Sequence, residues 1–221
     1  MKDISVLYKD TDILLINKPC GIPVQGGAGI SISLVDILTR QTGSPVFPVH
    51  RLDRETSGLL LVARNAATAS RLTRLLSGTE IVKKYCAVTM GVPSQLYGSI
   101  TTPVGRGIDK KNAETRYRVL ATAGTYSLIS AELITGRTHQ IRIHLASIGC
   151  PILADDKYGN FPLNRQIRKD HGIRKLQLVA NELELPQELN LPRHFIIPFP
   201  DHMMRCVESL GITFPLSIDT I

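Results

Sequence analysis

A cluster of charged residues that leads directly into an apolar segment is the feature that most restricts the fold of this chain. Residues 50–55 read His-Arg-Leu-Asp-Arg-Glu, which is five ionisable side chains in six positions, and the apolar segment follows at Gly58-Leu59-Leu60-Leu61-Val62. This apolar run is too short for a helix core and is typical of a fully buried strand. The sequence therefore predicts a charged loop beside the protein interior, where charges cost free energy unless they are paired.

Two interpretations of Asp53 follow from the residues alone. In the first, Asp53 forms a structural ion pair with Arg51 or Arg54 at the start of the strand. In the second, Asp53 is held ionised in a cleft and takes part in chemistry, because perturbed titratable groups gather at functional sites. The residues by themselves favour neither interpretation.

The order of residues in this segment resembles the central motif of the RluA family of pseudouridine synthases. The matching residues are His50-Arg51-Leu52-Asp53 and Thr56-Ser57-Gly58-Leu59. The aspartate of that motif is the catalytic nucleophile, so the resemblance implies this role for Asp53. It also implies isomerisation of uridine to pseudouridine in RNA, a reaction that adds and removes nothing. We therefore expect no cofactor.

Three further segments extend the resemblance. Residues 17–24 resemble the first motif of the family, which supports the active site. Tyr85 alone would be a half-buried strand tyrosine, but Lys84-Tyr85 resembles the second motif, whose tyrosine lies in the active site. Residues 136–140 precede what periodicity alone would describe as an amphipathic helix with a basic outer face. They resemble the third motif, whose arginine pairs with the catalytic aspartate, which implies that role for Arg137.

The resemblance also suggests how substrate would be held. The target base must leave its stack before it can react, and Arg51 resembles the residue that fills the vacated space in relatives. The ring of Tyr85 would pack on the detached uracil, and its hydroxyl would handle the proton at C5. Ile141 is our candidate for an apolar wall, and His50 and Thr56 are our further candidates for substrate binding.

The charge balance favours a polyanionic partner. The formal net charge is +7 and the pI is about 9.4, which makes RNA the expected partner. With aromatic content of 5% and no Trp, we expect the RNA to be held mainly through its phosphates. Residues 161–175 read as a basic loop that is either a solvated surface or an RNA-facing flank. Its cations are Arg165, Arg168, Lys169, Arg174 and Lys175.

Several other classes of protein and site are disfavoured. The four cysteines form no CxxC pair, and no HExxH motif is present, so we expect reduced thiols and no metal site. Asp155 and Asp156 resemble a metal-binding pair in isolation, but we expect them to be structural. No apolar stretch is long enough to span a bilayer, and the N-terminus lacks the pattern of a signal peptide. We expect a cytoplasmic protein without a membrane partner.

Many strands interrupted by a few helices indicate an α+β fold with a largely antiparallel mixed sheet. The resemblance implies the pseudouridine synthase fold, with flanking helices and a central RNA-binding cleft. We expect a single catalytic domain over residues 1–221 and a monomer. The expected helices lie at residues 34–40, 66–76, 138–148 and 203–210. The expected strands lie at residues 5–8, 13–16, 59–62, 80–88, 114–120, 126–134, 176–185 and 194–199.

The wording of the motifs most resembles the subgroup that modifies large-subunit ribosomal RNA (rRNA). Many of its members carry an N-terminal S4 domain, and this chain begins where their catalytic domain starts, so we expect a catalytic domain without S4. The alternatives are a synthase acting on transfer RNA and an RNA-binding protein without catalysis. A hydrolase that cleaves N-glycosidic bonds through Asp53 and a DNA-binding protein are more distant possibilities.

Overall fold

A computed structural model describes residues 3–105 and 107–213 and divides the chain into two compact units. Unit 1 contains the residues up to Ile81 together with Leu183–Phe195, and unit 2 contains Val82–Glu182 together with the residues from Ile196 onward. Both units combine helices with antiparallel strand pairs, which confirms the predicted α+β class. The predicted RNA cleft stays a prediction.

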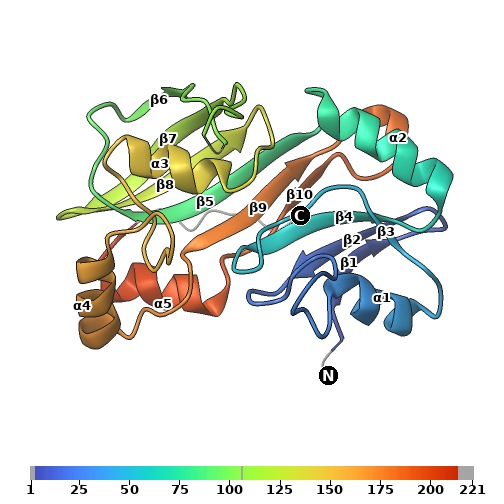
Figure 1. Cartoon of the computed structure of the whole chain (residues 1–221), viewed down its shortest axis with the longest axis horizontal. Helices are drawn as coiled ribbons and strands as arrows, with labels where there is room; N and C mark the ends of the chain where they lie inside the picture. Colours follow the sequence, from blue (N-terminus) through green and yellow to red (C-terminus); the bar gives the residue numbers. More distant parts are fainter. Residues whose placement is uncertain (1–2, 106, 214–221) are drawn as a thin grey trace. The chain divides into compact units, whose positions relative to one another are not determined.

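Unit 1 is built on a small antiparallel sheet (Figure 1). Its strands are β1 (Ser5–Lys9), β2 (Ile13–Lys18) and β4 (Ser57–Ala63) in that order, and β3 (Phe47–Pro48) also pairs with β4. The register of β2 on β4 runs from Ile13 opposite Ala63 to Lys18 opposite Gly58. All seven residues of β4 are buried, which confirms the prediction of a fully buried strand after the charged loop. Gly58 has a φ of 116°, a conformation that is open to glycine and strained for other residues.

Two helices of unit 1 begin at the predicted residues and end one or two residues later than predicted. Helix α1 (Leu34–Thr42) starts with a capping box between Ser33 and Asp36 and ends at Gly43, which is left-handed with a φ of 70°. Helix α2 (Ala66–Ser77) starts at Asn65, whose side chain accepts a hydrogen bond from the backbone of Thr68. These caps satisfy the free backbone groups at the helix ends.

Unit 2 contains four further antiparallel strands (Figure 1). They are ordered β5 (Val82–Met90), β8 (Tyr126–Leu133), β7 (Thr115–Ala123) and β6 (Tyr97–Ile100). The turn between β7 and β8 contains Gly124, which has a φ of 55°. Helix α3 (Gln140–Ser147) packs on β7, and helix α5 (Asp201–Ser209) packs on β5.

The remaining elements lie near the end of the chain. Strand β9 (Leu178–Glu184) pairs with β10 (His194–Ile196), and the short helix η1 (Gln187–Leu189) lies between them in sequence. Helix α5 begins at Asp201 after Pro200, two residues before the start of the predicted helix, and Asp201 lies in its first turn. Within the described residues, no helix combines the length and the apolar character needed to cross a membrane.

The predicted basic loop at residues 161–175 is wrong for most of its length, because Phe161–His171 form helix α4. Asn160 caps the helix by accepting a hydrogen bond from Leu163, and Gly172 ends it with a φ of 69°. Leu163 and Ile167 are one turn apart, and Ile167 is 2% exposed. The inner face of this polar helix therefore consists of few apolar residues. The many charged residues around them make the helical spacing difficult to recognise in the sequence.

Candidate active site

Asp53 lies in unit 1, in the turn that leads into β4. The backbone N–H of Thr56 donates to the carbonyl of Asp53 at 3.1 Å, and the preceding Leu52 is 4% exposed and anchors the turn in the core. The side chain of Asp53 is half-buried. Arg54, one of the two predicted ion partners, lies 3.6 Å from Glu55 and donates to the carbonyl of Gly21.

The turn that carries Asp53 is attached to the end of β2 by Lys18, which is fully buried. Its Nζ atom donates to the carbonyls of Pro19 at 2.9 Å, Ile22 at 2.8 Å and Arg54 at 3.0 Å. Burial lowers the pKa of Lys18 to about 8, and the acidic groups of Cys20, Glu55 and Asp53 oppose that shift. Nζ of Lys18 therefore binds two segments at once, the loop between β2 and α1 and the turn that carries Asp53.

His50 forms a second attachment for the same turn. Its Nε2 atom accepts a hydrogen bond from the backbone N–H of Leu61 in β4 at 2.9 Å, so this nitrogen is unprotonated. Arg51, the next residue, is exposed. Thr56 is 2% exposed, and its hydroxyl has no hydrogen-bond partner among the described residues.

Tyr85, Arg137 and Ile141 belong to unit 2. Tyr85 lies on β5 opposite Ala131 of β8 and is 6% exposed, and Ile141 lies on α3 and is 4% exposed. Arg137 is exposed in the turn before α3, where its Nε atom donates to the carbonyl of Asn112 at 3.2 Å. Its backbone N–H donates to the side chain of Gln140 at 3.0 Å.

Helix α3 differs from the amphipathic helix with a basic outer face that periodicity predicts. Arg142 and His144 are 3% and 0% exposed, so the basic residues point inward. The guanidinium of Arg142 binds both oxygens of Asp155 at 2.7 and 2.6 Å, and Asp156 lies 3.0 Å away. Burial alone would raise the pKa of Asp155, but the hydrogen bonds from Arg142 and from two backbone N–H groups hold it below its usual value. The two aspartates are structural, as predicted.

The predicted RNA-facing cations are all exposed. Arg165, Arg168 and Lys169 lie on α4, and Arg174 and Lys175 follow its end. Phe161 at the start of the helix is 51% exposed, one turn before Arg165. The three cations of the helix and this ring share one side, because positions three, four, seven and eight residues apart face the same way.

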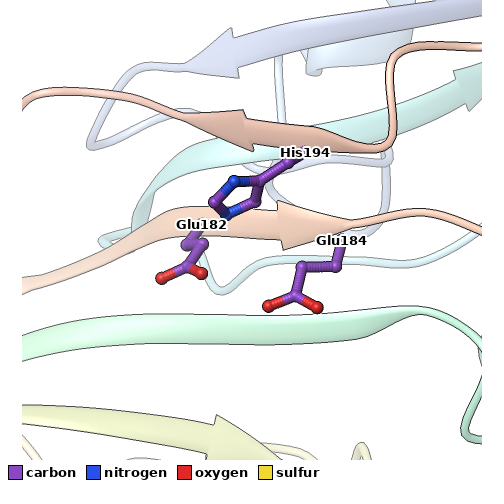
Figure 2. A group of neighbouring side chains, drawn as sticks. All are labelled: Glu182, Glu184 and His194. Carbon is purple, nitrogen blue, oxygen red and sulfur yellow. The ribbon is translucent and has the colours of Figure 1, made fainter. Parts of the chain in front are cut away.

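One group of described residues has the composition of a metal site, at Glu182, Glu184 and His194 (Figure 2). Their ligand atoms lie within 4.8 Å of one another, and the two carboxylates extend from the same side of β9. However, Nζ of Lys84 lies 2.7 Å from Glu182, so an ammonium already neutralises one carboxylate. We interpret the group as an ion-pair cluster.

Two of the four cysteines are held as neutral thiols. All four are free, as predicted, and Cys86, Cys150 and Cys206 are buried. Burial raises the pKa of Cys86 and of Cys206 to about 12. A thiol must lose its proton to act as a strong ligand or nucleophile, so these two thiols are inert at neutral pH.

Two residues that hold the candidate site are not among those that the motifs single out. Lys18 ends an apolar strand immediately before a proline, and a charge in such a strand is itself a signal of a specific buried partner. Gln140 begins α3 and is 2% exposed. Its role depends on hydrogen bonds to β7, more than twenty residues earlier in the chain, which local sequence patterns do not reveal.

Comparison with known sequences gives consistent matches. Residues 12–147 match the family described as RNA pseudouridylate synthase. A Rickettsia conorii protein named Ribosomal large subunit pseudouridine synthase C is 39% identical over 170 residues, which cover 70% of this chain and 56% of that protein. The protein of the same name in Escherichia coli O157:H7 is 33% identical over 222 residues, which cover 93% of this chain and 69% of that protein. The chain thus spans little more than half the length of the first relative.

Two solved structures share the fold. The human protein RNA Pseudouridylate Synthase Domain Containing 4 matches with a TM-score of 0.82 and 28% identity, over 96% of this chain and 94% of that chain. Human RNA Pseudouridylate Synthase Domain Containing 1 matches with a TM-score of 0.73 and 25% identity, over 90% and 84% of the two chains. These matches confirm the predicted pseudouridine synthase fold.

We predict that Lys18→Met removes a contribution of Lys18 that stabilises the folded protein as pH rises. The pKa of Lys18 is about 8 in the folded protein, against an ordinary value of 10.5. Between these values the unfolded state binds more protons at Lys18, so this group raises the free energy of unfolding with pH, by at most about 3 kcal/mol. The raised pKa values of the buried Cys86 and Cys206 act in the opposite direction, so the contribution of Lys18 is the difference between wild type and variant. Urea unfolding at about pH 7.5 and about pH 10 measures this difference.

The exposed Lys9 provides the control for this measurement. Lys9→Met should show the same change in unfolding free energy between the two pH values as wild type, whereas in Lys18→Met the contribution of Lys18 should be missing. The change that remains belongs to Lys83, whose pKa burial lowers, and to the buried cysteines, whose pKa burial raises. A change in Lys18→Met equal to that of wild type would show that Lys18 is not the buried cation described here.

Proposed function

The chain belongs to the RNA pseudouridylate synthase family, and from this premise we propose that it isomerises uridine to pseudouridine in large-subunit rRNA. The observation that supports the proposal most is the family match over residues 12–147, because that span contains Asp53, Tyr85 and Arg137 together. The choice of RNA follows the relatives, whose names specify the ribosomal large subunit.

The reaction makes Asp53 the nucleophile. A carboxylate must be ionised to attack, and its attack separates the uracil from its sugar as the glycosidic C–N bond breaks. The uracil then turns, a C–C bond forms in its place, and the carboxylate is released. No atoms are gained or lost, so the proposed reaction needs neither a cofactor nor a metal ion.

Arg137 and Tyr85 support this chemistry in the proposed mechanism. A guanidinium beside a carboxylate favours its ionised form and can aim it through two parallel hydrogen bonds. We assign this task to Arg137, as the family motif implies. The ring of Tyr85 packs on the detached uracil, and its hydroxyl handles the proton at C5.

The remaining residues of the proposal bind substrate. Arg51 is exposed, which suits a side chain that fills the space left by an extruded base. Ile141 offers an apolar wall to the uracil. Thr56 has a buried hydroxyl without a partner among the described residues, and such a group costs free energy until it is paired. The structural bond of His50 to Leu61 supports a role for His50 in holding the Asp53 turn more than a contact with RNA.

RNA outside the target nucleotide is proposed to lie along α4 and the residues after it. This surface consists of Arg165, Arg168, Lys169, Arg174 and Lys175, all exposed. The net charge of +7 supports a polyanionic partner. We further propose that the enzyme is a cytoplasmic monomer and that its two compact units act as one catalytic domain.

We predict that Asp53→Asn folds and binds RNA but does not isomerise it, because an amide cannot replace the ionised nucleophile. Release of tritium from RNA that contains 5-tritiated uridine measures the reaction. Asp3→Asn, a change at an exposed aspartate of the same unit, is the matched control and should be active. Activity of Asp53→Asn within about tenfold of wild type, a barrier change of only ~1.4 kcal/mol, would refute the assignment.

Tyr85→Phe should lower turnover more than RNA binding, since the ring remains and only the hydroxyl is lost. The expected loss for a positioned proton transfer is roughly 10²–10⁴-fold in kcat. Tyr85→Ala, which removes the ring as well, serves as the comparison. Normal turnover in Tyr85→Phe together with an inactive Tyr85→Ala would reduce the residue to a packing surface.

Neutralising Arg165, Arg168 and Lys169 to Gln should weaken the salt dependence of RNA binding. If all three cations touch phosphate, the slope of log affinity against log salt becomes shallower by about two units. The choice of target uridine should not change, because phosphate contacts position RNA and do not specify its sequence. Arg116→Gln is the control, since Arg116 already pairs with Glu114. An unchanged slope in the triple variant would return α4 to an ordinary solvated surface.

A further inference from the structure

The N-terminal end of α3 holds a chain of buried hydrogen bonds that the proposed chemistry does not use directly. Its polar members are Gln140, Thr115 and His144, and each is at most 2% exposed. Polar side chains buried this completely cost free energy unless they are paired. All three lie in unit 2, and together they join α3 to β7 and to the segment before β7.

The direction of each hydrogen bond follows from what its two ends can do. The carbonyl of Thr102 only accepts, so Nε2 of His144, 2.8 Å away, carries the proton. Nδ1 of the neutral ring then accepts from the hydroxyl of Thr115 at 2.9 Å. That hydroxyl oxygen accepts in turn from Nε2 of Gln140 at 2.9 Å. The network thus assigns the tautomer, and burial, which lowers the pKa of His144, keeps the ring neutral.

The amide of Gln140 is fully paired. Its Nε2 atom also donates to the carbonyl of Glu114 at 2.9 Å. Its Oε1 atom accepts from the backbone N–H of Arg137 at 3.0 Å and from the hydroxyl of Thr135 at 2.7 Å. Turning the amide over would bring donors against donors and acceptors against acceptors, so the paired chain fixes one orientation.

The backbone of Arg137 is therefore attached to β7 through a side chain that cannot turn. The side chain of Arg137 is exposed, and its Nε atom donates to the carbonyl of Asn112. A long exposed side chain is aimed largely by the backbone from which it starts. The identity of residue 140 also matters, because a glutamate there would lose both donors of the amide and place a carboxylate oxygen against the carbonyl of Glu114.

We propose that Gln140 is a positioning residue for Arg137 and that Thr115 and His144 act by fixing the orientation of its amide. This inference rests on the proposed function, because it assumes that Arg137 takes part in the isomerisation. It adds three residues to the machinery of the reaction, none of which needs to touch the RNA.

A double-mutant cycle tests the proposal. Gln140→Met keeps the length of the side chain and removes its hydrogen bonds, and a misplaced catalytic group can cost about 10²-fold in rate. We expect a loss of about this size in kcat with a small change in KM. In an Arg137→Ala background, Gln140→Met should add almost nothing, because the group that it positions is gone. A loss that multiplies with that of Arg137→Ala would overturn the proposal.

The pH dependence separates positioning from simple destabilisation. Gln140→Met should move the acid limb of the pH–rate profile to higher pH, in the same direction as Arg137→Ala, because both weaken the cation that favours the ionised nucleophile. Gln177→Met is the matched control, since Gln177 is also buried in unit 2 but bonds to the carbonyl of Lys175. Gln177→Met should leave the acid limb in place. An unmoved limb in Gln140→Met would contradict the proposal.

A third measurement is independent of activity. Amide hydrogen exchange at Arg137 should be slow in wild type and faster in Gln140→Met, because that N–H loses its acceptor. Thr115→Val, which keeps the shape of the side chain, should also speed exchange of the Arg137 amide. If Gln140→Met does not fold, Thr115→Val replaces it in every test. Unchanged exchange in both variants would overturn the positioning role. If wild type makes no pseudouridine but this amide is protected, the proposed function fails. The attachment of the Arg137 backbone to Gln140 is then still supported.

Discussion

The buried ammonium of Lys18 is the constraint on which the Asp53 turn depends. Three backbone carbonyls, from Pro19, Ile22 and Arg54, converge on its Nζ atom at 2.8–3.0 Å. Carbonyls directed at one point repel one another unless a donor lies between them, and a charged donor forms stronger hydrogen bonds than a neutral one. The lysine therefore joins the loop after β2 to the Asp53 turn, and two hydrogen bonds between Gly21 and Arg54 join the same two segments. The depressed pKa of Lys18 reflects the desolvation that this arrangement requires.

In unit 2 the turn that carries the candidate residue Arg137 is held by an uncharged side chain. The turn that carries Arg137 is held by the neutral amide of Gln140, which is fixed by Thr115 and His144. The buried charges of this unit lie further along α3, where Arg142 and Asp155 neutralise each other. A neutral amide suits this position, because it both accepts from the backbone N–H of Arg137 and donates to the carbonyl of Glu114. In both units a buried polar side chain holds the turn, and the exposed or half-buried neighbour is the residue to which we assign chemistry in the proposed function.

Sequence patterns predict the features of this fold that depend on local order. The burial of β4, the caps of α1 and α2 and the turn at Gly124 all follow from residue types at fixed spacing. Helix α4 was missed because only Leu163 and Ile167 mark its inner face while its cations suggest a loop. The inward direction of Arg142 and His144 was missed because periodicity treats charge as a sign of exposure. Their partners lie outside α3, where no local pattern records them.

For the candidate site, the motifs predict which residues carry the chemistry, and the structure adds what holds them. Lys18 and Gln140 are part of segments that resemble the family, but their hydrogen-bond partners are needed to explain their roles. The central claim is that this chain converts uridine to pseudouridine in large-subunit rRNA. Chemical mapping of pseudouridine in total RNA from cells with and without the gene tests it most directly. The account predicts that one or more pseudouridines of large-subunit rRNA disappear without the gene and return with wild type but not with Asp53→Asn. An identical pseudouridine map of that RNA in both cells would contradict the account.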